Sequence, residues 1–403
     1  MASVSPPSPD ELGALWQSHD DAWRDPSMAL TSWTGSKVDP RLLRAQATGS
    51  WWDTLERLDI TLLVTREYEH LVMALTVVDE RPAVSYLPLP HPSGLAIDRR
   101  RGVVSVASTR NPNQIYELEP VRATLKRGDV APADVSHRPL MPVRSIIHPG
   151  ALYIHDLAYV GGELHANSVG QNAVVRLPTR GGHERVWWPR AIEREGRPDF
   201  SRNWIQLNSI AAGPDLASSY FSASTETMGK RRPGHRNFPV NRRGVIFSGA
   251  TREPMVRGLT RPHSARLHKR RVWVDNSGYG ETGLVRDGAF EPVHRLPGWT
   301  RGLCFRQDVI FVGTSRVIPR FRQYAPGLDV ERSRCALHAL DARSGALLGS
   351  LTWPYGNQIF AVEWIARSQS TGLPVPISAS NGVGRLKHLF YSFDNPRRRH
   401  IDE

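Results

Sequence analysis

The chain is poor in cysteine and has no long hydrophobic run. It contains two cysteines, Cys304 and Cys335, among 403 residues, which is too few for a disulfide framework or a cysteine-rich metal site. No stretch approaches the roughly 20 apolar residues that a membrane-spanning helix needs. The opening residues, MASVSPPSPDELGAL, show neither the basic nor the apolar region of a secretory signal. These absences predict a cytoplasmic protein without membrane contacts, in which Cys304 is a buried, unreactive thiol of an apolar strand.

Negative charge is also scarce. Lysine and arginine number 52 against 39 aspartates and glutamates, and the formal net charge is +13. Such an excess favours anionic partners, although it says little about the fold. The arginines are dispersed, and no helix-turn-helix, zinc-finger or RNP signature is present, so nucleic acid is not the expected partner.

Helical periodicity is almost absent. It occurs clearly only over Ser8–Trp23, where Ser8 and Glu11 could form a capping box. We therefore expect one short N-terminal helix that lies outside the rest of the fold.

In place of helices the chain carries an internal repeat. Each copy is an apolar strand, a short polar turn, and a second strand that ends in a small residue followed by a hydroxyl or amide residue. A weaker sixth copy begins at Ala361, and its second strand, PISAS, ends at Ser380. The second strands of the five clear copies are Val103–Thr109, Glu163–Ser168, Tyr220–Thr225, Val272–Ser277 and Ile310–Ser315.

Copies that recur about 40 to 60 residues apart suit the four-stranded antiparallel blades of a β-propeller. We predict an all-β fold, a single propeller of six blades over residues 59–394. A helical and irregular extension (residues 1–58) precedes it, and a basic tail (residues 395–403) follows. The segment 60–88 has three strand-like runs. It either closes the ring against Arg385–Phe393 or forms a seventh blade.

Blade geometry brings polar residues together. The start of a first strand and the end of a second strand lie on the same face of the disc, so both sets surround one mouth of the central channel, which is the default ligand site. The Ser, Asn and Thr residues that close the second strands resemble turn caps, with Asn167 and Asn276 kept as ligand-binding candidates. The axial residues vary from copy to copy, as a binding site requires. They are Ser93, His155, Asn208, His263, Arg301 and Phe360, with His91 and Gln358 nearby.

His155 and His263 carry the candidate chemistry. They fall two blades apart, so their imidazoles could converge and, with Asn208 and water, hold a divalent transition metal. Without a metal they could act as a general acid and base, because imidazole titrates near neutral pH. Either histidine could instead be a satisfied structural hydrogen-bonder.

Two long insertions should rise from the same mouth. Thr225–Gly244 and Arg316–Arg334 both follow second strands, and long loops in compact domains are commonly lids or binding loops. Their basic residues, Arg316, Arg320 and Arg322 among them, predict an anionic small molecule or peptide as ligand. The aromatic residues Trp299, Phe321 and Tyr324 would give that ligand an apolar wall. Solvated surface loops are the alternative.

The runs IHDLAYVGGELHANS, RPHSARLH and LPGWTRG resemble a bacterial family of conserved hypothetical proteins that carry a domain of unknown function. The resemblance covers roughly residues 58–366 and implies a propeller-like fold without a known activity. The chain departs from the family at GNQIFAV, where Gln358 and Ala361 replace expected acidic residues, and this favours binding over catalysis. The matching site positions are His155, Asp156, Asn208, His263 and Arg301.

Two functions follow from the sequence. The first is an enzyme, metal-assisted or using histidine acid/base chemistry, that acts on an anionic small molecule or peptide. The second is a non-catalytic peptide- or protein-binding propeller that serves as an accessory factor in a biosynthetic pathway. The sequence does not choose between them.

Overall fold

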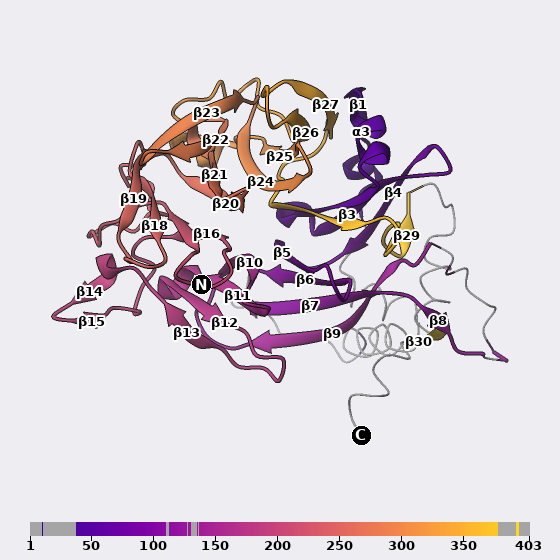
Figure 1. Cartoon of the computed structure of the whole chain (residues 1–403), viewed down its shortest axis with the longest axis horizontal. Coiled ribbons are helices and arrows are strands. Elements are labelled where there is room, and N and C mark those ends of the chain that lie inside the picture. Colours follow the sequence, from indigo (N-terminus) through magenta and orange to yellow (C-terminus); the bar gives the residue numbers. More distant parts are fainter. Residues whose placement is uncertain are drawn as a thin grey trace.

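The chain folds into a ring of six antiparallel β-sheets around a central axis (Figure 1). The computed structural model describes Asp10 and residues 38–109, 113–126, 128–129, 135, 137–377 and 392–394. No helix in these ranges is long and apolar enough to cross a lipid bilayer. The six-bladed propeller predicted from the repeat is confirmed.

Five blades are each built from consecutive hairpins, with the first strand innermost. They are β5 (Pro92–Asp98), β6 (Val103–Ser108), β7 (Asn113–Pro120) and β9 (Leu140–His148); β10 (Ile154–Val160), β11 (Glu163–Ser168), β12 (Ala173–Arg176) and β13 (Glu184–Trp187); β16 (Leu207–Ala211), β17 (Tyr220–Ala223), β18 (Gly244–Ser248) and β19 (Pro254–Leu259); β20 (Pro262–His268), β21 (Arg271–Asn276), β22 (Glu281–Arg286) and β23 (Ala289–Arg295); and β24 (Trp299–Arg306), β25 (Val309–Ser315), β26 (Ala336–Asp341) and β27 (Leu347–Thr352).

The remaining blade joins the two ends of the propeller. Its inner strand comes from the C-terminal part of the chain and its next three strands from the N-terminal part, in the order β28 (Ala361–Ala366), β2 (Ile60–Arg66), β3 (Leu71–Val78), β4 (Arg81–Pro88) and β29 (Val375–Pro376). Closure by both ends was predicted, but two details were wrong. The inner strand, β28, is the predicted first strand of the sixth copy, but it pairs with β2 and not with PISAS, and this pairing, not one with Arg385–Phe393, closes the ring. Segment 60–88 is therefore no seventh blade. Ser380 and most of Arg385–Phe393 lie outside the described residues.

The short elements lie around the ring. Strand β1 (Gln46–Gly49) adds a fifth strand to β27, and helix α3 (Trp51–Arg57) packs beside it. The helix predicted for Ser8–Trp23 lies outside the described residues apart from Asp10. The others are η1 (Pro40–Leu43), η2 (Glu67–Glu69), η3 (Val169–Gln171), η4 (Arg190–Ile192), η5 (Ser277–Tyr279), η6 (Pro319–Tyr324), and the strand pairs β8 (Ala123–Thr124) with β30 (Phe393–Asp394) and β14 (Glu193–Arg194) with β15 (Arg197–Pro198).

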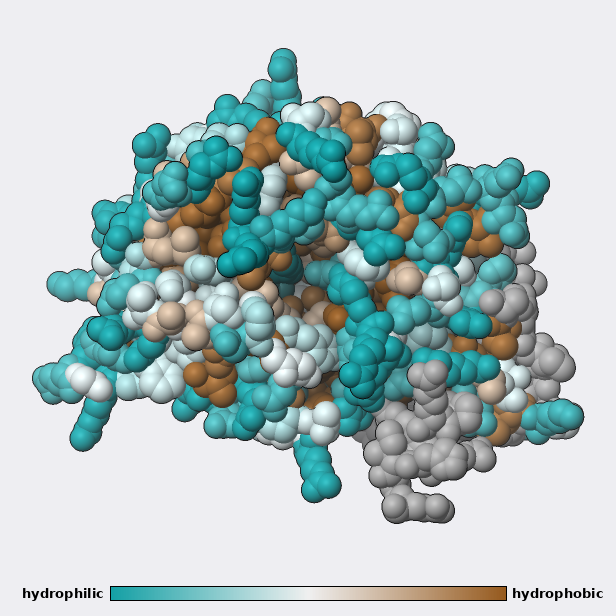
Figure 2. Space-filling model, viewed as in Figure 1, coloured by the Kyte–Doolittle hydropathy of each residue, from teal (hydrophilic) through white to brown (hydrophobic). Residues whose placement is uncertain are grey.

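The core is divided among the blade interfaces. Apolar residues alternate along the strands and fill the space between neighbouring sheets, so each interface has its own buried cluster. At the closing interface Leu63 and Val72 of one blade pack with Leu95 and Val106 of the next. Hydrophilic side chains cover much of the face in Figure 2, as the net charge of +13 requires.

The innermost strands approach one another so closely that glycine is needed. Gly302 of β24 has φ +85°, and a Cβ added there would lie 2.7 Å from Val362 Cγ2 of β28. This close packing brings the inner strands of the described blades into direct contact near the axis.

Candidate functional site

A β-bulge lies near the start of five of the six inner strands. The pairing register shifts after Pro92, Ile154, Leu207, His263 and Thr300, the positions where the axial residues were predicted. Bulges bend a strand and re-aim its side chains. The axial column therefore lies where the backbone departs from regular pairing.

A second backbone feature recurs two positions before four of the axial residues. His91, Tyr153, Gln206 and Arg261 all have positive φ, between 45° and 54°. Non-glycine residues with positive φ are uncommon and concentrate at functional sites. Three of the four, all except His91, line the cavity described next.

A cavity of about 690 Å³ occupies the predicted mouth. Both insertions contribute to its wall, the first through Arg232 and Gly234 and the second through Phe321 and Tyr324. Its lining residues are Glu67, Tyr68, Tyr153, His155, Gly170, Asn203, Gln206, Arg232, Gly234, Arg261, His263, Trp299, Arg301, Phe321, Tyr324, Gln358 and Phe360.

The two insertions pack against each other over the mouth. Val240 of the first insertion shares a buried apolar cluster with Trp299 and Tyr324, against which Phe321 also packs. Tyr324 Oη donates a hydrogen bond to Gly234 O at 3.2 Å. The aromatic wall predicted from the sequence is thus part of a small core that holds both loops.

Arg301 is the buried cation of the cavity. Its side chain is at the surface of the cavity although the residue is only 5% exposed, and its guanidinium lies 3.4 Å from the centre of the Phe360 ring. With its amide oxygen turned towards Arg301, Gln358 accepts a hydrogen bond from Nη1 and donates one to Glu67 Oε2, each at 3.2 Å. Burial lowers the pKa of Arg301 to about 10, against the opposing charge of Glu67. The guanidinium is therefore positively charged at neutral pH.

Arg261 is a second buried guanidinium in the wall. It donates to Gln206 Oε1 and, at 2.7 Å, to Pro233 O, and it stacks 3.9 Å from the centre of the Tyr324 ring. Burial lowers its pKa to about 10. With Arg232, three arginines thus face a cavity in whose described lining Glu67 is the only carboxylate.

His263 is held in one tautomer. Its Nδ1 lies 2.8 Å from Arg261 O and 3.1 Å from Ser277 Oγ. The Ser277 hydroxyl donates its proton to Thr300 O at 2.6 Å, so both neighbours of Nδ1 are acceptors and Nδ1 must carry the proton. Burial, followed by the charges of Arg301 and His155, holds the pKa of His263 well below its ordinary value. The imidazole is neutral, and the lone pair on Nε2 is available to a ligand.

His155 lines the same cavity. Its ring centre lies 5.2 Å from that of Tyr153 and 5.6 Å from that of Phe360, and its proximity contributes to the low pKa of His263. The convergence of the two imidazoles agrees with the sequence interpretation. Among the described residues no group of three or more His, Cys, Asp or Glu side chains is placed to hold a metal ion. Within the described part of the chain, the two histidines therefore have no third side-chain ligand of these types.

An ionic network lies next to the cavity, on the far side of His155, His263 and Arg301. Arg266 Nη1 lies 2.8 Å from Asp156 Oδ2, and Arg266 Nε lies 3.8 Å from Glu363 Oε1. Asp156 is thus the ion-pair partner of Arg266. Asn208 lines a small void of about 10 Å³ beside this network.

Four predicted site residues do not line the cavity and serve the framework. Ser93 Oγ donates towards Ala107 O and Ile154 O, which joins two blades. Asn167 accepts from Asp156 N and donates to Leu207 O, and Asn276 accepts from Thr260 N and donates to Glu281. The His91 ring packs 4.4 Å from that of His70, with its Nδ1 3.9 Å from Glu67.

The predicted arginines of the second insertion lie elsewhere. Arg316 donates to Pro354 O and Gly356 O and so clamps a turn. Arg322 is exposed and pairs with Glu331 at 2.9 Å. Arg320 belongs to η6, but its side chain lies outside the described part of the structure. This insertion contributes aromatic rings to the cavity, and the first contributes a cation, Arg232.

Sequence reasoning missed Glu67 and Tyr68 because they lie in η2, after β2. The sequence predicts PISAS, not β2, as the second strand of the sixth copy. The loop that follows β2 is therefore not predicted to lie at the mouth. Tyr153, Gln206 and Arg261 were missed because the repeat was aligned from the axial residue onward. Extending each copy by two residues towards the N-terminus would have included them.

Comparisons with known proteins agree with the fold. A chain of a nidogen/laminin complex matches with a TM-score of 0.51 at 10% identity, over 77% of this chain and 99% of that one. A protein of unknown function from Bacteroides caccae matches with a TM-score of 0.46 at 10% identity, over 76% and 99% of the two chains. A gluconolactonase from Xanthomonas campestris matches at 0.41 and 13%, over 74% and 86%. At these identities the likeness concerns the fold alone.

No curated protein matches the sequence. A family model does match, over residues 49–373, which include the four inner strands of all six blades and every described residue that lines the cavity. The chain therefore belongs to the family described as a domain of unknown function, DUF4915.

Proposed function

We propose that the axial cavity binds an anionic small molecule or peptide and that His263 acts on it as a general base. The observation that carries this proposal is the state of Arg301. It is buried and charged, and no ion pair joins it to a carboxylate of the described residues; the nearest opposing charge, Glu67, is linked to it through Gln358.

A buried charge without a paired counter-charge is costly. A carboxylate or phosphate in the cavity would supply the missing negative charge, and a guanidinium can hold either group with two parallel hydrogen bonds. Arg261 adds a second positive charge to the wall, and the rings of Trp299, Phe321 and Tyr324 would cover an apolar part of the ligand.

Binding of the anion would also activate His263. The charge of Arg301 is the second cause of the low pKa of this imidazole. An anion paired with Arg301 would offset that charge and raise the pKa of His263 towards neutrality, where a general base is most effective. Nε2 would then accept a proton from the bound substrate, and His155 is assigned as the proton donor.

Anion binding can be tested with simple probes. Succinate, phenylacetate and an acetylated Glu-Glu dipeptide are titrated calorimetrically into wild-type protein, Arg301→Met and the exposed control Arg322→Met. We expect binding to wild type and the control, and at least a tenfold loss in Arg301→Met, because a charge-assisted hydrogen bond contributes about 1.5–3 kcal/mol. Equal affinity in all three proteins would refute the assignment.

The second candidate function is binding without catalysis. It is favoured by the single carboxylate, Glu67, in the described lining of a cavity that has room for a peptide terminus. The discriminating variant is His263→Gln, assayed on any probe that binds wild type. Loss of turnover with retained binding supports the enzyme; binding without turnover in wild type supports the binding module.

A further inference from the structure

The basic residues of the first insertion form a rim beside the mouth of the axial cavity. Arg232 and Gly234 line the cavity wall, so the residues on either side of them lie at its edge. The insertion contains one carboxylate, Glu226, which is paired with Arg257 at 2.8 Å. Its exposed cations, which we call the basic rim, are Lys230, Arg231, Arg232, Arg236, Arg242 and Arg243.

The charge of the basic rim is not compensated locally. No ion pair joins any of its side chains to a carboxylate of the described residues. The second insertion lies over the same mouth but differs, because Arg322 pairs with Glu331 at 2.9 Å and Arg332 pairs with Asp329 at 3.4 Å. Of the rim residues only Arg232 lines the cavity. An anion small enough to lie within the cavity would therefore leave the rest of the rim without a counter-charge.

Contacts with the cavity wall hold the backbone of the rim in place. Arg261 Nη2 donates a hydrogen bond to Pro233 O at 2.7 Å, and Tyr324 Oη donates one to Gly234 O at 3.2 Å. Phe238 packs against the apolar cluster that joins the two insertions. The cations are therefore presented by a loop that is already folded, which reduces the ordering entropy that a partner must overcome on binding.

The other side chains of the first insertion favour an acidic polypeptide over other anionic partners. Single-stranded nucleic acids stack their bases on exposed aromatic rings, and membrane surfaces take up exposed apolar side chains. Phe238 is the one aromatic residue of this insertion, and it packs inward. None of the exposed large hydrophobic side chains of the described residues lies in the insertion. The rim offers charge alone, which carboxylate side chains complement.

We propose that the basic rim docks an acidic peptide segment whose free C-terminal carboxylate enters the axial cavity. The docking rests on the proposed function, because the terminal carboxylate is the anion that Arg301 binds. An extended chain advances about 3.3 Å per residue, so a few residues connect the cavity with the rim that begins at Arg232. Acidic side chains further along the peptide pair with the exposed cations, and the positive potential of the rim steers the peptide to the mouth.

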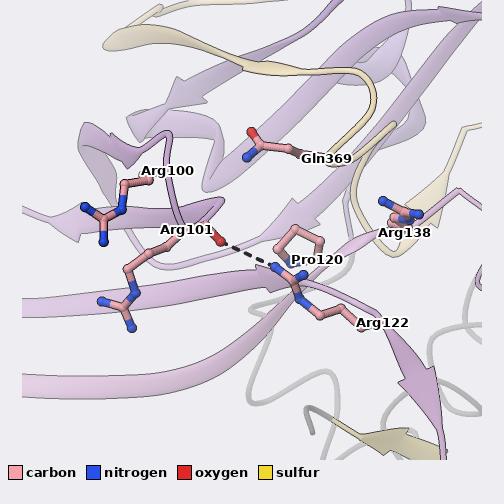
Figure 3. Close-up of a pocket in the computed structure, with 6 residues that line it drawn as sticks. All are labelled: Arg100, Arg101, Pro120, Arg122, Arg138 and Gln369. Carbon is pink, nitrogen blue, oxygen red and sulfur yellow. Dashed lines mark hydrogen bonds between the residues drawn. The ribbon is translucent and has the colours of Figure 1, made fainter. Parts of the chain in front are cut away.

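The test is isothermal titration calorimetry of synthetic, N-acetylated peptides into the full chain. The probes are the tripeptide Gly-Gly-Phe, the heptapeptide Glu-Glu-Glu-Glu-Gly-Gly-Phe, and the same heptapeptide with a C-terminal amide. The rim variant is Lys230→Glu/Arg236→Glu, at exposed residues that do not line the cavity. Its matched control, Arg100→Glu/Arg101→Glu, makes the same change in net charge in the turn after β5. Figure 3 shows this turn beside a pocket that shares no described lining residue with the axial cavity.

We expect the heptapeptide to bind wild type about tenfold more tightly than the tripeptide at low ionic strength, and this advantage should shrink as salt is added. Each exposed charge pair contributes roughly two- to fivefold in affinity. The rim variant should therefore lose about tenfold for the heptapeptide, while its affinity for the tripeptide and the affinities of the control change less than about threefold. Unliganded melting temperatures should agree, which shows that the variants fold.

The results separate the docking from the proposed function. Loss of heptapeptide affinity in the rim variant alone, together with weak binding of the amide, supports the docking. Equal binding of heptapeptide and tripeptide to wild type, with both weakened in Arg301→Met, overturns the docking and leaves the proposed function standing. Undiminished binding of the amide overturns the placement of the C-terminus in the cavity. Unchanged binding of the tripeptide to Arg301→Met overturns the proposed function itself.

Two further results would point to other partners. Equal losses in the rim variant and the control overturn the docking in favour of diffuse attraction to a basic protein. Tighter binding of oligothymidylate or of phosphatidylserine vesicles than of the heptapeptide overturns it in favour of a nucleic acid or a membrane surface.

Discussion

Two buried arginines near the propeller axis should respond in opposite ways to the same substitution. Arg266 is paired with Asp156 at 2.8 Å, whereas Arg301 has no ion-pair partner among the described residues. Burial alone would lower the pKa of both. The charge of Asp156 raises the pKa of Arg266 above its ordinary value, but the pKa of Arg301 falls to about 10.

These values give the magnitudes. The difference between 12.5 and about 10 for Arg301, at about 1.4 kcal/mol per pH unit, corresponds to about 3 kcal/mol of destabilisation. Its folded-state pKa is below its unfolded-state value, so this cost is complete below pH 10 and disappears only above pH 12.5. Methionine removes the cost but also the stacking on Phe360, worth about 1–2 kcal/mol. We expect Arg301→Met to stabilise the empty protein by about 1–2 kcal/mol. Arg266→Met leaves Asp156 buried and unpaired and should destabilise it by about 3–5 kcal/mol.

The assay is urea denaturation at pH 7, followed by tryptophan fluorescence and circular dichroism, with Arg322→Met as an exposed control. Unfolding free energies are compared at matched m-values, so that changes in the unfolded state are recognised. If Arg301→Met proves as destabilising as Arg266→Met, then Arg301 is compensated within the protein. The argument for an anionic ligand would fail with it.

Three further predictions concern the framework. Burial lowers the pKa of His338 to about 3, so the neutral imidazole contributes its full stability above pH 6.5, and the unfolding free energy falls as the pH drops below that value. We expect His338→Asn to reduce this loss by about 3 kcal/mol at pH 4. Urea denaturation midpoints measured from pH 7 to pH 4 test this. Gly302→Ala should lower the unfolding free energy by about 2–4 kcal/mol, because the added methyl group is strained and overpacks the strand interface. Gly258→Ala should lower it by about 1 kcal/mol, because Gly258 has φ +83° but nothing lies within 4 Å of the added Cβ. Equal losses in urea denaturation would contradict the close packing of β24 and β28. Burial raises the pKa values of Cys304 and Cys335, so Ellman's reagent should label neither thiol in the native protein and both in urea; rapid native labelling would contradict their burial.

The blades could be predicted because their signals are local. Each hairpin such as β10 and β11 alternates apolar and polar residues around a short turn, and the copies reinforce one another along the sequence. The closing blade has no such local signal, because its inner hairpin is not formed by consecutive strands. Strand β28 pairs with β2, which lies about 300 residues away in the sequence. Neither segment carries a local sequence pattern that indicates which strand it pairs with. The sixth copy was therefore given a false second strand.

The site was partly predictable for the same reason. His155, His263 and Arg301 occupy one repeated position, so the alignment of the copies brought them to one mouth. Asn167 and Asn276 occupy another repeated position, but their amides already form hydrogen bonds with backbone groups and, at Asn276, with the Glu281 carboxylate. A polar residue at a strand end has the same sequence signal in both cases, and only its hydrogen-bond partners distinguish them.

The sequence by itself determined the six-fold repeat, the face on which function should lie and the residues of the axial column, because these depend on period and strand direction. Tertiary structure alone decided which charges are paired. Glu67 approaches Arg301 across the closure of the ring, and Asp156 binds Arg266 from two blades away. Charge compensation depends on distances of a few ångströms between groups far apart in the chain, and such distances exist only once the ring has closed.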